Sequence, residues 1–219
     1  MEAHQFGATD DRNGRRLLVM LPGAHMRPED FATEGFVSAL GERGCPLDAT
    51  ALRLDLADYS EPDFPDQLHE IVVAPALTLG YVGISLLGIS LGGMGALLYA
   101  RRRPEVARRI VLLAPFLATR GTIAEVVAAG GLTSWQSARR GPDNLERGLL
   151  GWISSPDFVA SIAPRLLLGF GSEDRFAEAS LLLARLIPRE QLVTEPGWHD
   201  WPCWRRLWNR ILGDRSHEL

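Results

Sequence analysis

The chain contains no lysine, so every one of its 23 basic residues is arginine. A P-loop phosphate site, a pyridoxal Schiff base and a lysine general base each require an ammonium group that approaches phosphate or loses a proton. The absence of lysine therefore excludes these classes of enzyme. Basic residues are also outnumbered by 27 acidic residues. The resulting formal net charge of −4 offers no electrostatic surface for nucleic acid.

Cysteine is scarce as well, since the chain has only Cys45 and Cys203. Two cysteines so far apart have neither the spacing of metal ligands nor the number needed for a disulfide framework. We therefore expect ordinary thiols in a reducing compartment. Residues 1–16 hold no apolar stretch of signal-peptide length, which favours the cytoplasm as the location.

One long segment, residues 71–100, has no charged residue and exceeds the length of about 20 residues that spans a bilayer. It also contains six glycines, Pro75, Ser85 and Ser90, and a span here would separate two flanks that look like halves of one fold. These features disfavour a membrane span. We expect instead a helix end, a buried strand, a sharp turn and a second helix, and no membrane association.

Strand-like and helix-like segments alternate along the whole chain. We expect strands at 16–21, 49–54, 82–89, 109–114, 165–170 and 191–194, and helices at 31–43, 64–79, 91–103, 176–187 and 202–212. This alternation predicts an α/β fold with a mostly parallel sheet of about six strands and helices on both faces. Residues 1–219 form one expected domain. The segment at about 116–163 is too long for a plain connection and predicts a small helical lid.

Residues 88–92 read Gly-Ile-Ser-Leu-Gly, a G-x-S-x-G motif between an expected strand and an expected helix. The pentapeptide alone is a weak signal, and its position strengthens it. A strand that turns directly into a helix exposes the serine at the carboxyl edge of the sheet, where the positive end of the helix favours an oxyanion. Ser90 is therefore the candidate nucleophile. The alternative is a glycine-rich packing turn or a phosphate loop, and it is disfavoured because both G-x-G-x-x-G spacing and lysine are missing.

A serine nucleophile requires a histidine base from a loop at the same edge of the sheet. His199 follows the last expected strand and is our preferred base, whereas His25 follows the first strand and is its only rival. His4 and His217 lie in expected tails, and His69 lies inside an expected helix. The sequence therefore favours His199.

The third member of such a set is a carboxylate that holds the histidine, and two candidates follow the strand at 165–170. We prefer Asp174 and expect Glu173 to face solvent. The order of Ser90, Asp174 and His199 along the chain is the one expected of one fold in particular.

These three motifs resemble the α/β-hydrolase superfamily over residues 17–212. Residues 88–96, Gly-Ile-Ser-Leu-Gly-Gly-Met-Gly-Ala, and residues 197–201, Gly-Trp-His-Asp-Trp, look like the serine esterases related to esterase D and enterochelin esterase. The resemblance implies an α/β-hydrolase fold and hydrolysis of small acyl esters through an acyl-enzyme. It also implies that neither a metal nor an organic cofactor takes part. The family's His-Gly after the first strand is replaced here by Pro-Gly-Ala-His at residues 22–25.

By position in that resemblance, the oxyanion donors are the backbone N–H groups of Ala24 and Leu91. Neither role depends on the side chain. Candidate substrate-binding residues are the aromatic and imidazole side chains near these loops, namely His25, Phe116, Trp135 and Trp198. For His25, an exposed loop position without a role in binding is the competing interpretation.

The natural substrate stays open at this point. Thioesterases, acyltransferases and peptidases of the same fold share this chemistry, so the partner is a small-molecule ester or thioester of unassigned structure. A non-catalytic ligand-binding protein on a hydrolase scaffold is the alternative from another class. Such proteins usually lose a member of the Ser–His–Asp set, and this chain keeps all three.

Overall fold

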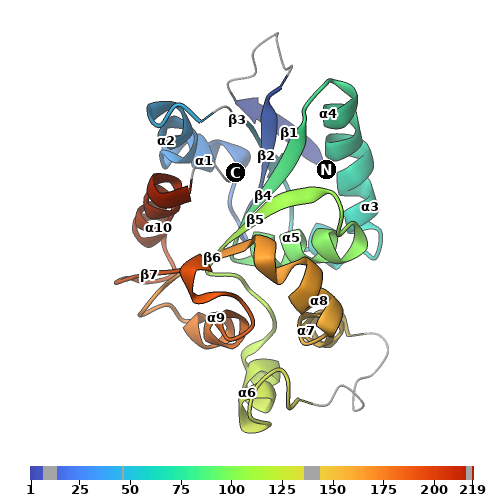
Figure 1. Ribbon diagram of the computed structural model, residues 1–219, viewed down its shortest axis with the longest axis vertical. Helices are drawn as coiled ribbons and strands as arrows, with labels where there is room; N and C mark the ends of the chain where they lie inside the picture. The colour runs from blue at the N-terminus through green and yellow to red at the C-terminus, as the bar shows by residue number, and fades with distance from the viewer. Residues whose placement is uncertain (7–13, 46, 136–143, 216–218) are drawn as a thin grey trace.

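A computed structural model describes residues 1–6, 14–45, 47–135, 144–215 and 219. Within these residues the strands form one seven-stranded sheet in the order β1-β3-β2-β4-β5-β6-β7 (Figure 1). All neighbouring strands are parallel except β1 and β3, which are antiparallel. The strands are β1 (Glu2–Phe6), β2 (Arg16–Leu21), β3 (Leu47–Arg53), β4 (Gly83–Ile89), β5 (Ala107–Leu113), β6 (Leu166–Gly171) and β7 (Leu192–Glu195).

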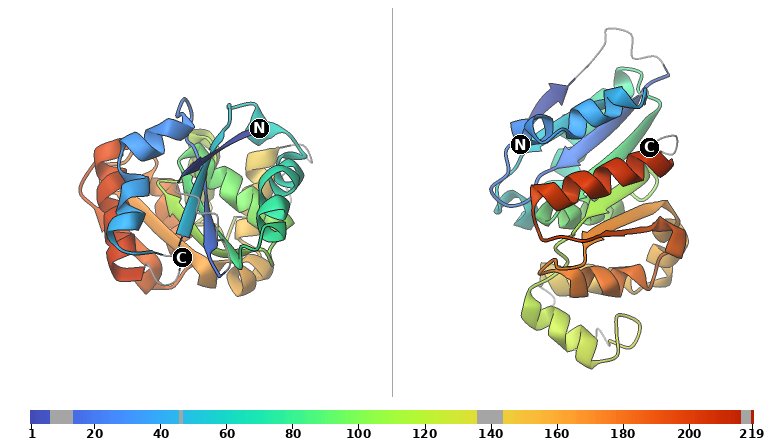
Figure 2. Two further views of the ribbon diagram at one scale, coloured as in Figure 1. Left: turned by 90° about the horizontal axis from the view of Figure 1, so that it is seen from above. Right: turned by 90° about the vertical axis from the view of Figure 1, so that its left-hand side faces the viewer.

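Helices cover both faces of the sheet, as the alternation of segments predicted. The helices are α1 (Pro28–Thr33), α2 (Phe36–Glu42), α3 (Phe64–Leu68), α4 (Ala74–Thr78), α5 (Leu91–Arg102), α6 (Arg120–Ala128), α7 (Leu145–Ile153), α8 (Pro156–Ser161), α9 (Ala177–Ala184) and α10 (Trp201–Arg215). One face carries α1, α2 and α10, and the other carries α3, α4 and α5 (Figure 2). The fold is therefore a three-layer α/β sandwich.

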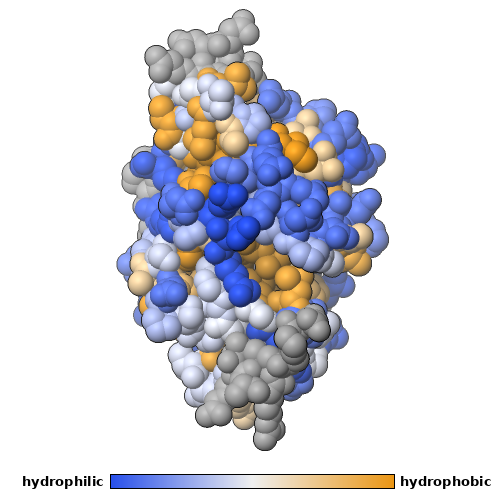
Figure 3. All heavy atoms as spheres, turned by 90° about the vertical axis from the view of Figure 1, so that its right-hand side faces the viewer, coloured by the Kyte–Doolittle hydropathy of each residue, from blue (hydrophilic) through white to orange (hydrophobic). Residues whose placement is uncertain are grey.

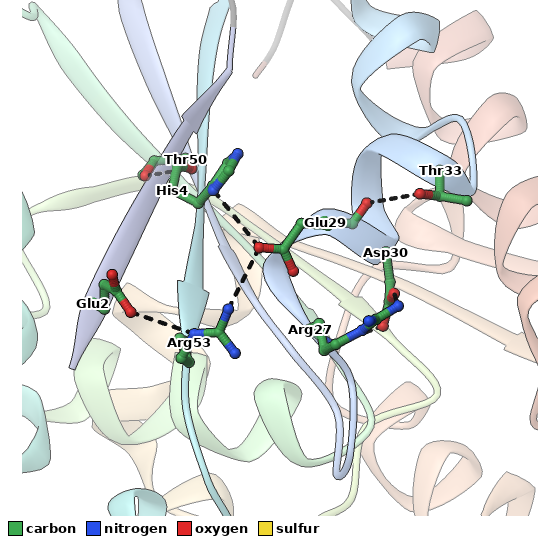
Figure 4. A network of polar contacts seen from close by, with 8 residues as sticks. All are labelled: Glu2, His4, Arg27, Glu29, Asp30, Thr33, Thr50 and Arg53. Carbon is green, nitrogen blue, oxygen red and sulfur yellow. Dashed lines mark hydrogen bonds and ion pairs between the residues drawn. The ribbon is translucent and has the colours of Figure 1, made fainter.

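The amino terminus, which we expected to be a tail, forms β1, a strand in addition to the six that the sequence predicted. Thr50 Oγ1 donates a hydrogen bond to the carbonyl of His4 over 3.2 Å. Arg53 forms ion pairs with Glu2 at 3.3 Å and Glu29 at 3.4 Å (Figure 4). Four of the five residues of β1 are exposed, so the strand carries no alternation of apolar and polar residues. Its formation depends on the free edge of β3, which the local sequence does not reveal.

Two helices that we expected to be continuous are interrupted. The helix expected at 31–43 divides into α1 and α2 at Gly35, whose φ of 81° is left-handed and incompatible with an α-helix. In the helix expected at 64–79, a π-helical turn, His69–Val73, separates α3 from α4. Pro75 follows this turn. Because proline has no N–H and its ring collides with the carbonyl four residues earlier, the wider turn relieves the clash.

The uncharged segment 71–100 is divided between the core and the surface. Every residue from 91 to 100 in α5 is buried, as are the last six residues of β4. On the side that carries α3 and α4, hydrophobic residues form separate areas among hydrophilic ones (Figure 3). Within the described residues, no helix combines the length and the apolar character needed to cross a membrane.

The segment expected as a lid contains α6, α7 and α8, and α6 stands apart from the layers of the sandwich (Figure 1). Side chains of α7 contact α6 and Thr119, the residue that precedes it. The Glu146 carboxylate accepts hydrogen bonds from the N–H and hydroxyl of Thr119 at 2.9 and 3.1 Å. Arg147 pairs with Glu125 at 2.6 Å. Residues 136–143 of this segment lie outside the described part of the chain.

Candidate active site

Ser90 lies at the sharp turn between β4 and α5. Its φ of 52° is positive, which is uncommon for a residue with a side chain. The turn is fixed from the neighbouring strand, because the N–H of Ser90 donates to the carbonyl of Leu113 at 2.9 Å and the carbonyl of Ser90 accepts from Phe116 at 2.8 Å. The serine hydroxyl is thus held at the carboxyl edge of the sheet.

Glycines on both sides of Ser90 allow this turn to pack. A Cβ on Gly88 would lie 2.3 Å from the carbonyl oxygen of Gly92, and a Cβ on Gly92 would lie 2.0 Å from the carbonyl oxygen of Leu21. Neither distance is possible for a real side chain. The two small residues of the G-x-S-x-G motif are therefore required by close approach of the backbone of β4, α5 and the end of β2.

His199 lies in the loop after β7, and its ring reaches Ser90. The Nε2 atom is 2.9 Å from Ser90 Oγ, and the Nδ1 atom is 2.8 Å from Asp174 Oδ2. Because an ionised carboxylate only accepts hydrogen bonds, Nδ1–H donates to Asp174 and Nε2 is left to accept from the serine hydroxyl. The three side chains form one continuous chain of hydrogen bonds.

Two members of this chain of hydrogen bonds, the acid and the imidazole, are shielded from solvent, and Ser90 is half-buried. The side chain of Asp174 is fully buried and that of His199 is 9% exposed. Asp174 Oδ1 also accepts the N–H of Phe176 at 2.7 Å, so both carboxylate oxygens are satisfied. Phe176 and Trp204 pack edge-on against the imidazole at centroid distances of 4.9 and 5.0 Å. Sequence reasoning did not identify these two ring contacts, because the sequence does not show which side chains reach the histidine loop.

The other histidines lie elsewhere. His25 is exposed in the loop after β2, with a φ of 64°. His69 contacts the hydroxyl of Tyr99 at 3.0 Å. His4 lies on β1 rather than in a tail, and His217 lies outside the described residues. The structure therefore brings His199 to Ser90, as the preferred interpretation of the sequence expected.

Glu173 does not simply face solvent as expected. Its carboxylate accepts the N–H of Gly197, two residues before His199, and a 2.8 Å hydrogen bond from the hydroxyl of Ser172. The two adjacent acids thus contact different parts of the histidine loop. Asp174 holds the ring, and Glu173 holds the backbone.

The two backbone N–H groups expected at an oxyanion site lie at neighbouring positions of the same edge. Leu91 is the first residue of α5. Ala24 follows Gly23, where an added Cβ would lie 3.3 Å from the carbonyl oxygen of Ile89. Within the described residues, neither N–H donates a hydrogen bond to the protein. Both groups are therefore available to a bound oxygen atom.

A cavity of about 520 Å³ opens beside the turn at Ser90. Its apolar wall includes Leu91, Met94 and Phe116, and its polar wall comes from the ends of the α6 and α7 region. The full lining is Leu56, Ser60, Leu91, Met94, Phe116, Thr119, Thr122, Asn144, Leu145, Glu146 and Arg147. The volume lies within the range of about 300 to 1,000 Å³ that is usual for small-molecule sites.

The remaining candidate pocket residues lie apart from this cavity. His25 lines a second cavity of about 400 Å³ that also includes Ala24 and shares Leu56 with the first. Trp135 is buried under the guanidinium of Arg147 rather than lining the first cavity. Trp198 is 67% exposed and lines neither cavity. Of the four, only Phe116 lines the larger cavity.

Neither cysteine belongs to the chain of hydrogen bonds from Asp174 to Ser90. Burial raises the pKa of Cys203 to about 11, so its thiol is neutral near pH 7 and a poor nucleophile. Cys45 is half-buried, and neither cysteine is in a disulfide. Within the described residues there is no group of three or more His, Cys, Asp or Glu side chains arranged to hold a metal ion.

Comparison with known proteins gives one family match and a set of similar structures. The model of the alpha/beta hydrolase family matches residues 18–218. A ferulic acid esterase is 14% identical, with a TM-score of 0.68 over 96% of this chain and 88% of its own. The fluorophosphonate-binding serine hydrolase F of Staphylococcus aureus is 16% identical, with a TM-score of 0.66 over 96% and 87%.

An S-formylglutathione hydrolase from Agrobacterium tumefaciens is 16% identical, with a TM-score of 0.59 over 95% of this chain and 86% of its own. None of the curated proteins matches this chain in sequence. At identities this low, the similar structures establish the fold and leave the activity to be argued from the site.

Proposed function

Since the chain belongs to the alpha/beta hydrolase family, we propose that it is a serine hydrolase that cleaves small carboxylic esters through an acyl-enzyme. The observation that carries this proposal is the continuous chain of hydrogen bonds from the buried Asp174 through His199 to Ser90. A serine hydroxyl is a weak nucleophile at neutral pH and requires a base at hydrogen-bond distance. The esterases among the similar structures support the same activity.

In the first half of the proposed reaction, Ser90 Oγ bonds to the ester carbonyl carbon while His199 Nε2 takes the hydroxyl proton. Asp174 accepts the Nδ1–H bond and stabilises the imidazolium without becoming protonated. The carbonyl oxygen becomes an oxyanion, to which the N–H groups of Ala24 and Leu91 donate. The bond to the leaving alcohol then breaks, and His199 returns the proton to that alcohol.

In the second half, water replaces the alcohol. His199 takes a proton from the water, and the resulting hydroxide bonds to the acyl carbon. The bond to Ser90 Oγ then breaks, and the proton returns to the serine. The free acid leaves with one oxygen from water, so the enzyme is regenerated without an external oxidant, reductant or metal.

The larger cavity supports the assignment of the substrate as a small molecule. Phe116 and Leu91 belong both to its lining and to the surroundings of Ser90, so a substrate group in this cavity lies next to the nucleophile. We propose Phe116 as a wall of the substrate pocket. The smaller cavity is lined by Ala24 and His25 and shares Leu56 with the larger one, and we propose that it receives a second group of the substrate.

A fluorophosphonate probe tests the proposal directly, because only an activated serine reacts with it quickly. We expect one label per chain, at Ser90, and loss of labelling in Ser90→Ala. Peptide mass spectrometry locates the label, and turnover of p-nitrophenyl esters of increasing chain length measures the acyl preference. Equal labelling of the Ala variant would refute Ser90 as the nucleophile. An unlabelled wild type would favour a ligand-binding protein instead.

A further inference from the structure

Glu173 has both carboxylate oxygens engaged although the residue is exposed. Its Oε2 atom accepts the N–H of Gly197, and its Oε1 atom accepts the hydroxyl of Ser172 at 2.8 Å. Most exposed carboxylates gain little from single contacts, because water competes for them. This carboxylate instead bridges two loops that both contribute to the site.

The backbone of the same two loops is joined at the same place. The N–H of Ser172 donates to the carbonyl of Glu195 at 2.9 Å, and the N–H of Glu173 donates to the carbonyl of Gly197 at 3.0 Å. The paired residues of β6 and β7 end at Gly171 and Glu195. Beyond that pair, the N–H of Gly197 has a side-chain carboxylate as its acceptor in place of a strand carbonyl.

Gly197 has only backbone groups by which it can be held. Its φ of 143° is strained for residues with a side chain, and a Cβ there would lie 2.7 Å from a guanidinium nitrogen of Arg206. A Cβ on Gly171 would in turn lie 2.2 Å from the carbonyl oxygen of Gly197. Both the N–H and the carbonyl of Gly197 bond to Glu173. Glu173 therefore holds the loop two positions before His199 through both backbone groups of Gly197.

We propose that Glu173 is a positioning residue that holds Gly197 so that the ring of His199 reaches Asp174 and Ser90 together. The inference rests on the proposed function, in which His199 is the base. The ring makes one hydrogen bond of 2.8 Å and one of 2.9 Å in opposite directions, so a displacement of the loop lengthens at least one of them. A misplacement of about 1 Å in such a site costs up to about 100-fold in rate.

The test compares Glu173→Ala, Glu173→Gln and the control Glu178→Ala. Glu178 is an exposed acid on α9, and within the described residues it makes no hydrogen bond or ion pair through its side chain. With p-nitrophenyl acetate, we expect Glu173→Ala to lower kcat by about 10- to 100-fold with KM changed less than about twofold. Glu173→Gln keeps an amide oxygen that accepts the N–H of Gly197, so we expect it to recover most of that loss.

Two further readouts separate positioning from folding. The concentration of active sites is counted by fluorophosphonate labelling of Ser90 in a separate sample, and kcat is calculated from that concentration. The midpoint of thermal unfolding is measured for every variant. A fall in the midpoint with normal kcat per labelled site would show a purely structural role and overturn the proposal. If Glu173→Ala does not fold at the assay temperature, Glu173→Asp replaces it, because the shorter carboxylate cannot reach Gly197 and the same loss of kcat is expected.

The outcome also distinguishes this inference from the proposed function. If the wild type is labelled at Ser90 and Glu173→Ala turns over as fast as Glu178→Ala, only the role of Glu173 is wrong. If the wild type is neither labelled nor active on esters, the serine hydrolase assignment and the positioning role fall together.

Discussion

Ser90 is one of three residues with a side chain that have a positive φ within the described residues, and all three follow strands at the carboxyl edge of the sheet. His25 follows β2, Ser90 follows β4 and Ala114 follows β5. A conformation of this kind costs about 1 to 3 kcal/mol and persists only where the surroundings determine it. The strained backbone therefore coincides with the residues that surround the candidate nucleophile.

The residue-scale prediction concerns the buried acid. Asp174→Asn is expected to lower kcat by about 100-fold or more, approaching the factor of about 10⁴ that follows from the wrong imidazole tautomer, because an amide no longer fixes Nδ1–H. Ester kinetics measure the loss, and circular dichroism verifies the fold. Glu173→Gln in parallel should lose far less. If Asp174→Asn is near normal and Glu173→Gln is severely impaired, Glu173 rather than Asp174 is the acid that orients His199. If both variants are near normal, this loop does not supply that acid.

At the scale of elements, β4, the turn and α5 form the unit that holds Ser90. This unit tolerates no side chain at Gly88 or Gly92, since the nearest backbone atoms would lie 2.3 and 2.0 Å from the added Cβ. One turn further along α5, the ring of Tyr59 packs against Gly95, where an added Cβ would lie 2.3 Å from that ring. The glycines of this helix therefore serve close packing against the sheet, despite the lower helix propensity of glycine.

Gly92→Ala tests this unit. Because the clash is with the backbone of β2 rather than with a flexible side chain, we expect the free energy of unfolding to fall by about 3 kcal/mol, at the upper end for overpacking, and activity to be lost. Urea denaturation measures the change. Gly41→Ala in α2 is the matched control, since an added Cβ there meets no atom within 4 Å. It should raise stability by up to about 1 kcal/mol. Similar stability of the two variants would contradict the packing argument.

At the scale of the whole molecule, the parallel sheet brings distant parts of the chain to one edge. The loops after β2, β4, β6 and β7 supply Ala24, Ser90, Asp174 and His199 respectively. Since parallel strands all end at the same edge, residues that are far apart in sequence meet there. The side chain of Asp174 is fully buried at this edge, and this burial strengthens its interaction with the imidazole.

A whole-molecule prediction follows from the source of charge stabilisation. The proposed oxyanion donors are backbone N–H groups, one of them at the positive end of α5, so no step requires a metal ion. Prolonged treatment with a chelator should therefore leave ester hydrolysis unchanged, as measured on the same p-nitrophenyl ester before and after treatment. Loss of activity that a divalent ion restores would contradict the mechanism.

The sequence by itself determined the α/β class, the order of β2 to β7 along the chain and the position of Ser90 between a strand and a helix. These features depend on short-range patterns, since apolar runs, Gly and Pro act on neighbouring residues. Strand β2 was predicted at its observed bounds, and the other predicted strands at bounds within a few residues. The order of serine, acid and histidine along the chain reduced the number of candidate folds, because a parallel sheet places the loops that carry these residues at one edge.

Only the tertiary structure decided which groups touch. The formation of β1 required the edge of β3, and the division at Gly35 depended on a backbone angle that the pattern does not encode. Glu173 and Asp174 are adjacent acids, and the sequence does not show that one meets the backbone of Gly197 while the other meets the ring of His199. The direction of a loop side chain is set by contacts with segments remote in sequence, so the separation of these two roles appears only when β6 and β7 lie side by side.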